Sequence, residues 1–150
     1  AMAFFQGHHR ILSKLQILKE VGLGYLTLGQ STNTLSGGES QRLKLAQHIG
    51  QSEKRKTLFI FDEPTTGLHM ADVELLLRTF DELISQGHSI IVIEHNLDLI
   101  QHADYIIDLG PEGGEQGGRI VEEGSLKTIM ASQQSYTGQF LRKRLGMDKA

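Results

Sequence analysis

Two short apolar runs joined by an amphipathic segment constrain the fold more than any other feature of the chain. Residues 57–62 and 89–94 are short and rich in apolar side chains, which is typical of buried strands. Between them a helix is predicted over about 70–85, with an inner face made by Val73, Leu76, Leu77, Phe80 and Ile84. Strand–helix–strand units form right-handed crossovers. The sequence therefore predicts an α/β fold with a mainly parallel sheet flanked by helices.

The other elements follow from the same periodicities and from glycine-rich turns. Residues 22–34 should form a loop with a short extended piece, because glycine and threonine are frequent there. Two further strands are predicted on either side of a turn at 110–114, over 105–109 and 118–123. Further helices are predicted over about 9–21 (ended by Gly22), 37–49, 97–102, 126–131 and 137–144.

Composition narrows the function classes. The chain has 150 residues, a net charge of −3 and no cysteine. One domain with a real core is expected, and disulfides and thiolate zinc sites are excluded within these residues. The charge gives no support for a globally basic nucleic-acid-binding surface. No apolar run is long enough to cross a membrane and no signal peptide opens the chain, so a cytoplasmic location is expected.

The start of the helix at 37–49 has the form of a phosphate site. Ser36, Gly37 and Gly38 precede Glu39, so Ser36 and Glu39 make an S-x-x-E capping box. A helix N-terminus presents unpaired N–H groups and partial positive charge, and glycine lets the backbone approach an anion closely. The alternative is an ordinary capped helix, which Ser-Gly-Gly alone would favour.

Acidic residues follow the first apolar strand. Asp62 and Glu63 should lie at the carboxyl edge of the sheet, where Glu94 and His95 end the second strand. Asp62 can help to hold Mg²⁺, directly or through water, and Glu63 can orient or deprotonate an attacking water. The alternative is a polar strand end.

Two histidines accompany the acidic pair. His95 could hydrogen-bond a γ-phosphate or the attacking water, with a capping histidine as the alternative. His69 lies in the turn after Glu63, close to the predicted site. The remaining histidines show no partner pattern and are interpreted as surface or packing residues, namely His8, His9, His48, His88 and His102.

These signals carry weight because they occur together and in order. A phosphate-type helix start, a strand ending in Asp62–Glu63 and a strand ending at His95 are the parts of a nucleotide-hydrolysing site. No G-x-x-x-x-G-K-[S/T] loop occurs in the chain. The sequence therefore predicts half of an ATPase site.

The motifs resemble those of a known family. Residues 35–41 (LSGGESQ) resemble the signature of ABC-type ATPases, the strand ending in Asp62–Glu63 resembles their Walker B motif, and His95 their switch histidine. Residues 62–69 (DEPTTGLH) are similar to the version in UvrA, the damage-recognition ATPase of excision repair, and so are the runs at 21–30, 92–98 and 106–114. The resemblance covers about 18–141.

The resemblance implies a fold and a domain. Residues 1–150 would be the C-terminal part of one ABC ATPase head, with signature helix, Walker B strand, switch-histidine strand, C-terminal hairpin and helices. The phosphate-loop strand, the Gln loop and the zinc modules of the family are missing from the chain. The chain is therefore expected to be an incomplete P-loop NTPase domain with an exposed sheet edge. Whether it is a fragment or a natural short protein stays open.

The resemblance also implies partners and roles. Ser36, Gly37, Gly38 and Glu39 would serve ATP bound on a second head, of the same protein or of a dimer mate. Asp62 with Mg²⁺, Glu63 and His95 would serve the ATP of their own head. The intact protein would hydrolyse ATP and act on damaged DNA with other excision-repair subunits, whereas the isolated chain is expected to be inactive.

Three alternatives remain at this point. A UvrA-like paralogue outside repair, for example in drug resistance, would share these motifs. A non-catalytic interaction module would keep the fold only. A transporter ATPase is disfavoured by the Thr66–His69 turn. Basic runs at 54–56 and 142–144 are interpreted as solvated faces.

Overall fold

The computed structural model describes residues 1–49, 56–110 and 118–147 and divides the chain into two compact units. The first unit covers Ala1–Glu94 and the second His95–Ala150. Residues 111–114 of the turn predicted at 110–114 and two residues of the first basic run, Lys54 and Arg55, lie outside the described residues.

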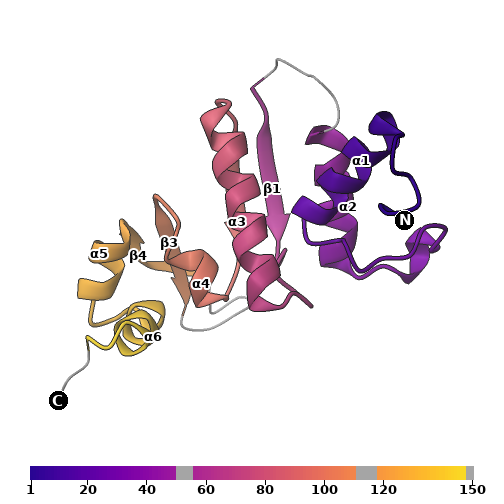
Figure 1. Cartoon of the computed structure of the whole chain (residues 1–150). Coiled ribbons are helices and arrows are strands. Elements are labelled where there is room, and N and C mark those ends of the chain that lie inside the picture. Colours follow the sequence, from indigo (N-terminus) through magenta and orange to yellow (C-terminus); the bar gives the residue numbers. More distant parts are fainter. Residues whose placement is uncertain (50–55, 111–117, 148–150) are drawn as a thin grey trace. The chain divides into compact units, whose positions relative to one another are not determined.

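The first unit consists of helices around one pair of strands (Figure 1). In chain order it contains α1 (His9–Glu20), a 3₁₀ turn η1 (Thr32–Thr34), α2 (Gly37–Ile49), β1 (Leu58–Asp62), α3 (Met70–Ser85) and β2 (Ser89–Ile93). β1 and β2 are parallel and in register from Leu58 opposite Ser89 to Asp62 opposite Ile93. The predicted crossover, strand pairing and helix positions are confirmed.

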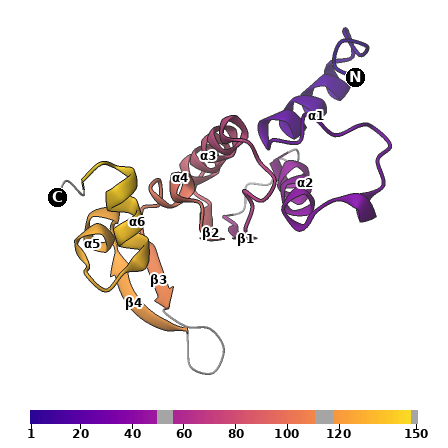
Figure 2. The same ribbon diagram turned by 90° about the horizontal axis from the view of Figure 1, so that it is seen from below.

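The core of the first unit lies on one face of this strand pair. Phe59 and Phe61 stack on that face, the His48 ring of α2 lies 4.8 Å from Phe59, and the Phe80 ring of α3 lies 5.0 Å from Phe61. Figures 1 and 2 show α3 running beside β1. The opposite face is apolar and exposed, with side chains of Leu58, Ile60, Ile91 and Ile93 each at least half accessible.

Glycines end two helices of the first unit, as predicted. Gly22 follows α1 with φ +75 and Gly87 follows α3 with φ +89, a left-handed conformation that glycine adopts without a Cβ penalty. The loop between α1 and α2 differs from expectation. Residues 22–34 contain no strand, and their end forms the η1 turn, in which the Thr34 amide and hydroxyl both donate to the Ser31 carbonyl.

The second unit is a hairpin covered by short helices (Figure 2). β3 (Ile106–Gly110) and β4 (Arg119–Gly124) pair antiparallel with a bulge at Asp108 and Leu109, after α4 (Leu97–Ile100) and before α5 (Leu126–Ala131) and α6 (Tyr136–Arg144). Ile106, Ile129 and Leu141 form its buried cluster. The predicted C-terminal hairpin is confirmed.

The described strands therefore form two sheets of two strands each. The α/β class is confirmed, and the parallel pairing lies in the first unit. The hairpin is antiparallel because too few residues separate Gly110 from Arg119 for the crossover that parallel neighbours need.

Candidate functional site

The tip of α2 is a closed capping box. The Ser36 amide donates to Glu39 Oε2 at 2.6 Å, and the Glu39 amide donates to Ser36 Oγ at 3.2 Å. The sequence prediction of an S-x-x-E box is confirmed. Each interaction satisfies an N–H that the first helical turn would otherwise leave unpaired.

Tyr25 completes this cap, and sequence reasoning assigned it no role. Its hydroxyl donates to Glu39 Oε1, so both carboxylate oxygens of Glu39 are engaged. This hydrogen bond, ahead of the one from the Ser36 amide, holds the pKa of the Glu39 carboxyl below its usual value. Glu39 is therefore fixed as a charged cap at the tip.

The two glycines of the tip have different surroundings. A Cβ built on Gly37 would meet no atom within 4 Å, so the space over the exposed first residue of α2 is open. Gly38 is buried, and a Cβ there would lie 3.4 Å from the Glu63 carbonyl oxygen and 3.5 Å from that of Thr66. Gly37 therefore borders open space, whereas Gly38 allows close packing.

The acidic pair lies where the parallel strands end, as predicted. Asp62 is the last residue of β1 and is exposed. Glu63 follows it, with its amide donating to the Ile93 carbonyl at 2.9 Å. Among the described residues Glu63 is the one non-glycine with positive φ, at 48°. Such strained residues collect at functional sites, because the surrounding structure has to enforce them.

Glu94 anchors the turn that follows the acidic pair. Its Oε1 accepts the Thr65 amide at 2.9 Å and the Thr65 hydroxyl at 2.5 Å. Both contacts are partly buried, where charge-assisted hydrogen bonds are strong. The end of β2 therefore holds the turn after β1, a structural role that sequence analysis did not assign to Glu94.

Two neighbouring residues of α2 also hold the acidic turn. Gln41 Nε2 donates to the Asp62 carbonyl at 2.9 Å, and the Asp62 amide donates to Gln41 Oε1 at 3.0 Å. Arg42 is fully buried, and its Nη1 donates to the Pro64 carbonyl. Sequence reasoning missed both residues. Arg42 could have been found from the helical repeat, because it lies one turn after Gly38 on the same face of α2.

A groove borders both the tip and the turn. It has a volume of about 740 Å³ and is lined by Met2, Lys19, Gly24, Tyr25, Glu39, Gly67, His69, Asp72 and Leu75. His69, the residue before α3, thus shares a surface hollow with Glu39. This agrees with the expectation that His69 lies close to the site.

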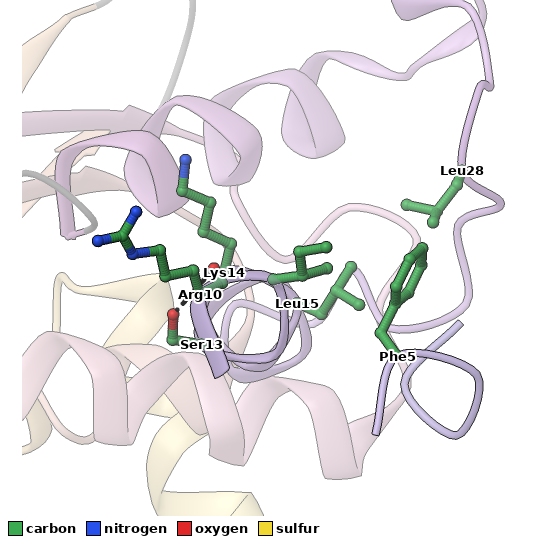
Figure 3. Close-up of a pocket in the computed structure, with 7 residues that line it drawn as sticks. Phe5, Arg10, Ser13, Lys14, Leu15 and Leu28 are labelled. Carbon is green, nitrogen blue, oxygen red and sulfur yellow. Dashed lines mark hydrogen bonds between the residues drawn. The ribbon is translucent and has the colours of Figure 1, made fainter. Parts of the chain in front are cut away.

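A separate hollow lies along α1 and contains none of the predicted site residues. It has a volume of about 470 Å³. Figure 3 shows Leu15, Phe5 and Leu28 on one side, while the charged ends of Arg10 and Lys14 point away from them. The hollow is an apolar groove remote in sequence from the acidic turn.

His95 is the first residue of the second unit. It is exposed and precedes Asn96, whose side chain accepts the Asp98 amide at 2.9 Å and caps α4. The predicted role of His95 stays a prediction. Two other histidines have packing contacts, as expected: His48 contacts the Phe59 ring, and His88 Nδ1 accepts the Thr57 amide at 3.1 Å.

The basic run at 142–144 is partly used inside the second unit. Arg142 Nη1 donates to the carbonyls of Met130 and Ser132 at the end of α5. Arg144 pairs with Asp98. Arg142 is therefore partly buried in the fold, which differs from the interpretation as a solvated face, whereas Lys143 and Arg144 are exposed, in agreement with it.

Residues 1–49, 56–110 and 118–147 contain neither a metal-binding cluster nor a membrane-spanning helix. No group of three or more His, Cys, Asp or Glu residues there could hold a metal ion. No helix in those ranges is long and apolar enough to cross a membrane.

Known proteins are similar to nearly the whole chain. UvrABC system protein A of Aquifex aeolicus is 54% identical over 145 residues, which are 97% of this chain and 16% of that protein. The Staphylococcus aureus (strain COL) protein of the same name is 51% identical over 149 residues, 99% of this chain and 16% of its own length. No protein-family profile matches.

Solved structures agree. UvrA2 from Deinococcus radiodurans superposes with a TM-score of 0.84 at 44% identity, covering 97% of this chain and 18% of that one. A bacterial Atm1-family ABC exporter with ATP bound gives 0.59 at 24% identity over 91% of this chain and 24% of its own, which shows the shared ABC ATPase fold alone. The chain spans about 16% of the length of the curated relatives that it matches, and over that stretch it is similar to proteins of the UvrA family.

Proposed function

We propose that this chain is the C-terminal part of one ATPase head of a UvrA-like protein that recognises DNA damage in nucleotide excision repair. The similarity to UvrABC system protein A over 97% of the chain supports the family role. The observation that carries the chemical part is Glu63, a strained carboxylate directly after Asp62 at the end of a parallel strand. In the intact protein these residues would take part in ATP hydrolysis.

The tip of α2 would bind phosphate oxygens of ATP held on a second head. Ser36 supplies a hydroxyl, and the open space over Gly37 fits an anion close to the backbone N–H groups of the first turn. Gly38 lets the tip pack against the acidic turn, and Glu39 keeps the tip in shape through the capping box. The second head belongs to the same protein or to a dimer mate.

The acidic turn would serve ATP on its own head. Asp62 is exposed at the strand end and fits a ligand role toward Mg²⁺, directly or through water. When bound, the ion supplies charge neutralisation at the phosphates. Glu63 orients the attacking water and accepts its proton, and His95 hydrogen-bonds the γ-phosphate or that water.

The remaining assignments concern the whole protein. Damaged DNA and the other excision-repair subunits would be contacted by the full-length protein rather than by this stretch alone. The protein would act in the cytoplasm. Zinc would not bind in this stretch, because no cysteine is present.

A chimera tests the proposal. This chain replaces the matching 145 residues of the Aquifex aeolicus protein, and magnesium-dependent ATP turnover and ATP binding are measured. Glu63→Gln should keep ATP binding and lower kcat about a hundredfold or more, because the general base is lost. Unchanged turnover in that variant would remove Glu63 from the role of base. Robust turnover by the isolated 150-residue chain would contradict the split site.

The chimera also separates the rival functions. A UvrA-like paralogue outside repair would hydrolyse ATP but fail to restore excision in cells that lack the repair protein. A non-catalytic module would show partner binding that is indifferent to ATP.

A further inference from the structure

We propose that Gln41 and Arg42 are positioning residues that clamp the acidic turn, residues 62–66, to the tip of α2. A displacement of the tip would then reach Glu63. The catalytic meaning of this clamp rests on the proposed function, whereas the clamp itself is a feature of this chain. Neither residue is assigned a part in phosphate, metal or water contacts above.

Gln41 covers the open edge of β1. Its amide group donates to the carbonyl of Asp62 and accepts from the amide of the same residue. The pair of hydrogen bonds copies the pattern that a neighbouring strand would offer. A primary amide is needed for this, because leucine offers neither group and glutamate offers acceptors only.

Arg42 fixes the next part of the turn. Its side chain is fully buried and Nη1 donates to the Pro64 carbonyl, while Nε and Nη2 have no hydrogen-bond partner within the described residues. Buried donors without partners lower stability. A buried guanidinium that donates to the loop after Glu63, while two of its donor atoms have no hydrogen-bond partner in the described part of the chain, is explained by positioning better than by stability.

Gly38 brings the two parts together. A Cβ at Gly38 would lie 3.3 Å from Arg42 Nη1 and 3.4 Å from the Glu63 carbonyl oxygen. Any side chain at Gly38 would therefore crowd both the guanidinium and the turn, and glycine lets the tip of α2 lie close to both. Displacement of the tip is then expected to be passed on to the turn, because packed groups do not move independently.

The strained backbone conformation of Glu63 explains why its neighbours need to be held in place. A non-glycine residue at φ 48° stays there only when its surroundings enforce the conformation. Gln41 holds the residue before it and Arg42 holds the residue after it. The two side chains therefore enforce the orientation of the Glu63 carboxylate from α2.

Amide hydrogen exchange by NMR on the 150-residue chain tests the clamp. Gln41→Leu should speed exchange of the Asp62 amide by about tenfold or more, because one hydrogen bond of about 1.4 kcal/mol is worth that factor. Gln47→Leu, at an exposed position of the same helix, is the matched control and should leave that amide unchanged. Gln41→Glu, which keeps an acceptor, should restore part of the protection.

A second variant tests transmission. Glu39→Gln perturbs the tip, and it should shift the amide resonances of residues 62–66 in the parent chain but not in a Gln41→Leu, Arg42→Met background. Equal shifts in both backgrounds, or unchanged Asp62 exchange in folded Gln41→Leu, would overturn the clamp. If Gln41→Leu does not fold, Gln41→Met decides, because methionine has a similar length and lacks the amide group: protection of Asp62 equal to the parent would contradict the proposal.

The catalytic consequence has its own readout. In the chimera, Gln41→Leu should lower kcat with little change in KM, because Glu63 loses its orientation while ATP contacts remain. A rise in KM at constant kcat would refute the positioning role. A chimera that never hydrolyses ATP would defeat the proposed function, but the exchange result would still decide the clamp.

Discussion

Two acidic residues, one in each unit, have opposite surroundings. In the second unit, the carboxylate of Asp108 on β3 accepts the Ser135 hydroxyl at 2.5 Å and the Thr137 hydroxyl at 2.7 Å. In the first unit, Asp62 is bound to Gln41 through its backbone amide and carbonyl, and the residue is exposed to solvent. The Asp108 carboxylate is therefore bound by hydroxyl groups of its own unit, whereas Asp62 is exposed at the end of a strand.

The glycines of the two units repeat this contrast. Gly138 of α6 is buried, and a Cβ there would overlap the carbonyl oxygen of Ile129. Gly37 of α2 is exposed with nothing over it. Gly138 allows close packing in the second unit, whereas Gly37 leaves the tip of α2 open in the first unit. The difference teaches that residues of one type can serve stability at one position and access at another.

The largest expected effect concerns Gly138. Gly138→Ala should destabilise the second unit by about 3 kcal/mol, because α6 must move away from α5 to admit the methyl group. Gly37→Ala, the matched change, should alter stability by no more than about 1 kcal/mol and in the favourable direction, through helix propensity. Urea unfolding of both variants measures this. Equal losses of stability in the two variants would contradict the distinction between buried Gly138 and exposed Gly37.

A smaller effect is expected for the acids. Asp108→Asn should cost about 2 kcal/mol, because a charged acceptor of two hydroxyl donors becomes a neutral amide with one oxygen. Asp62→Asn should change the free energy of unfolding by less than about 0.5 kcal/mol, as expected for an exposed carboxyl. The unfolding midpoints of the two variants provide the measurement, and a reversed order would contradict the assignment of Asp62 as an exposed acid.

The smallest effect is a pH dependence at the tip of α2. The hydrogen bond from Tyr25, followed by that from the Ser36 amide, lowers the pKa of Glu39 in the folded state. The resulting stabilisation is present above the ordinary glutamate pKa of about 4 and is lost as the pH falls through the lower folded value. An NMR titration should show the Glu39 midpoint rising in Tyr25→Phe. An unmoved midpoint would show that Tyr25 does not support the cap.

The elements of the fold were predictable because their periodicities are clear. Short-range patterns predict the strands β1 and β2, the helix α3 and the capping box of Ser36 and Glu39. The left-handed glycines after α1 and α3 were predictable for the same reason. The η1 turn was missed because it is marked by hydrogen bonds from Thr34 to the Ser31 carbonyl rather than by a repeat.

The contacts around the candidate site were less predictable. Gln41, Arg42 and Tyr25 act over 14 to 22 residues of sequence separation. No periodicity marks a side chain that binds a distant backbone carbonyl. The strain at Glu63 was hidden as well, because it results from surroundings that only the folded chain assembles. The local sequence pattern predicted the acidic residues, but only the tertiary structure showed which side chains hold them in place.

The most direct test of the account compares two acids of the same chain in one assay. ATP turnover at saturating ATP and Mg²⁺ is measured for the Aquifex aeolicus chimera carrying Glu63→Gln or Asp108→Asn, with the folded fraction determined for each. The account predicts a loss of about a hundredfold or more for Glu63→Gln and near-parent turnover per folded molecule for Asp108→Asn. Near-parent turnover in Glu63→Gln, or an equal loss in both variants, would contradict it.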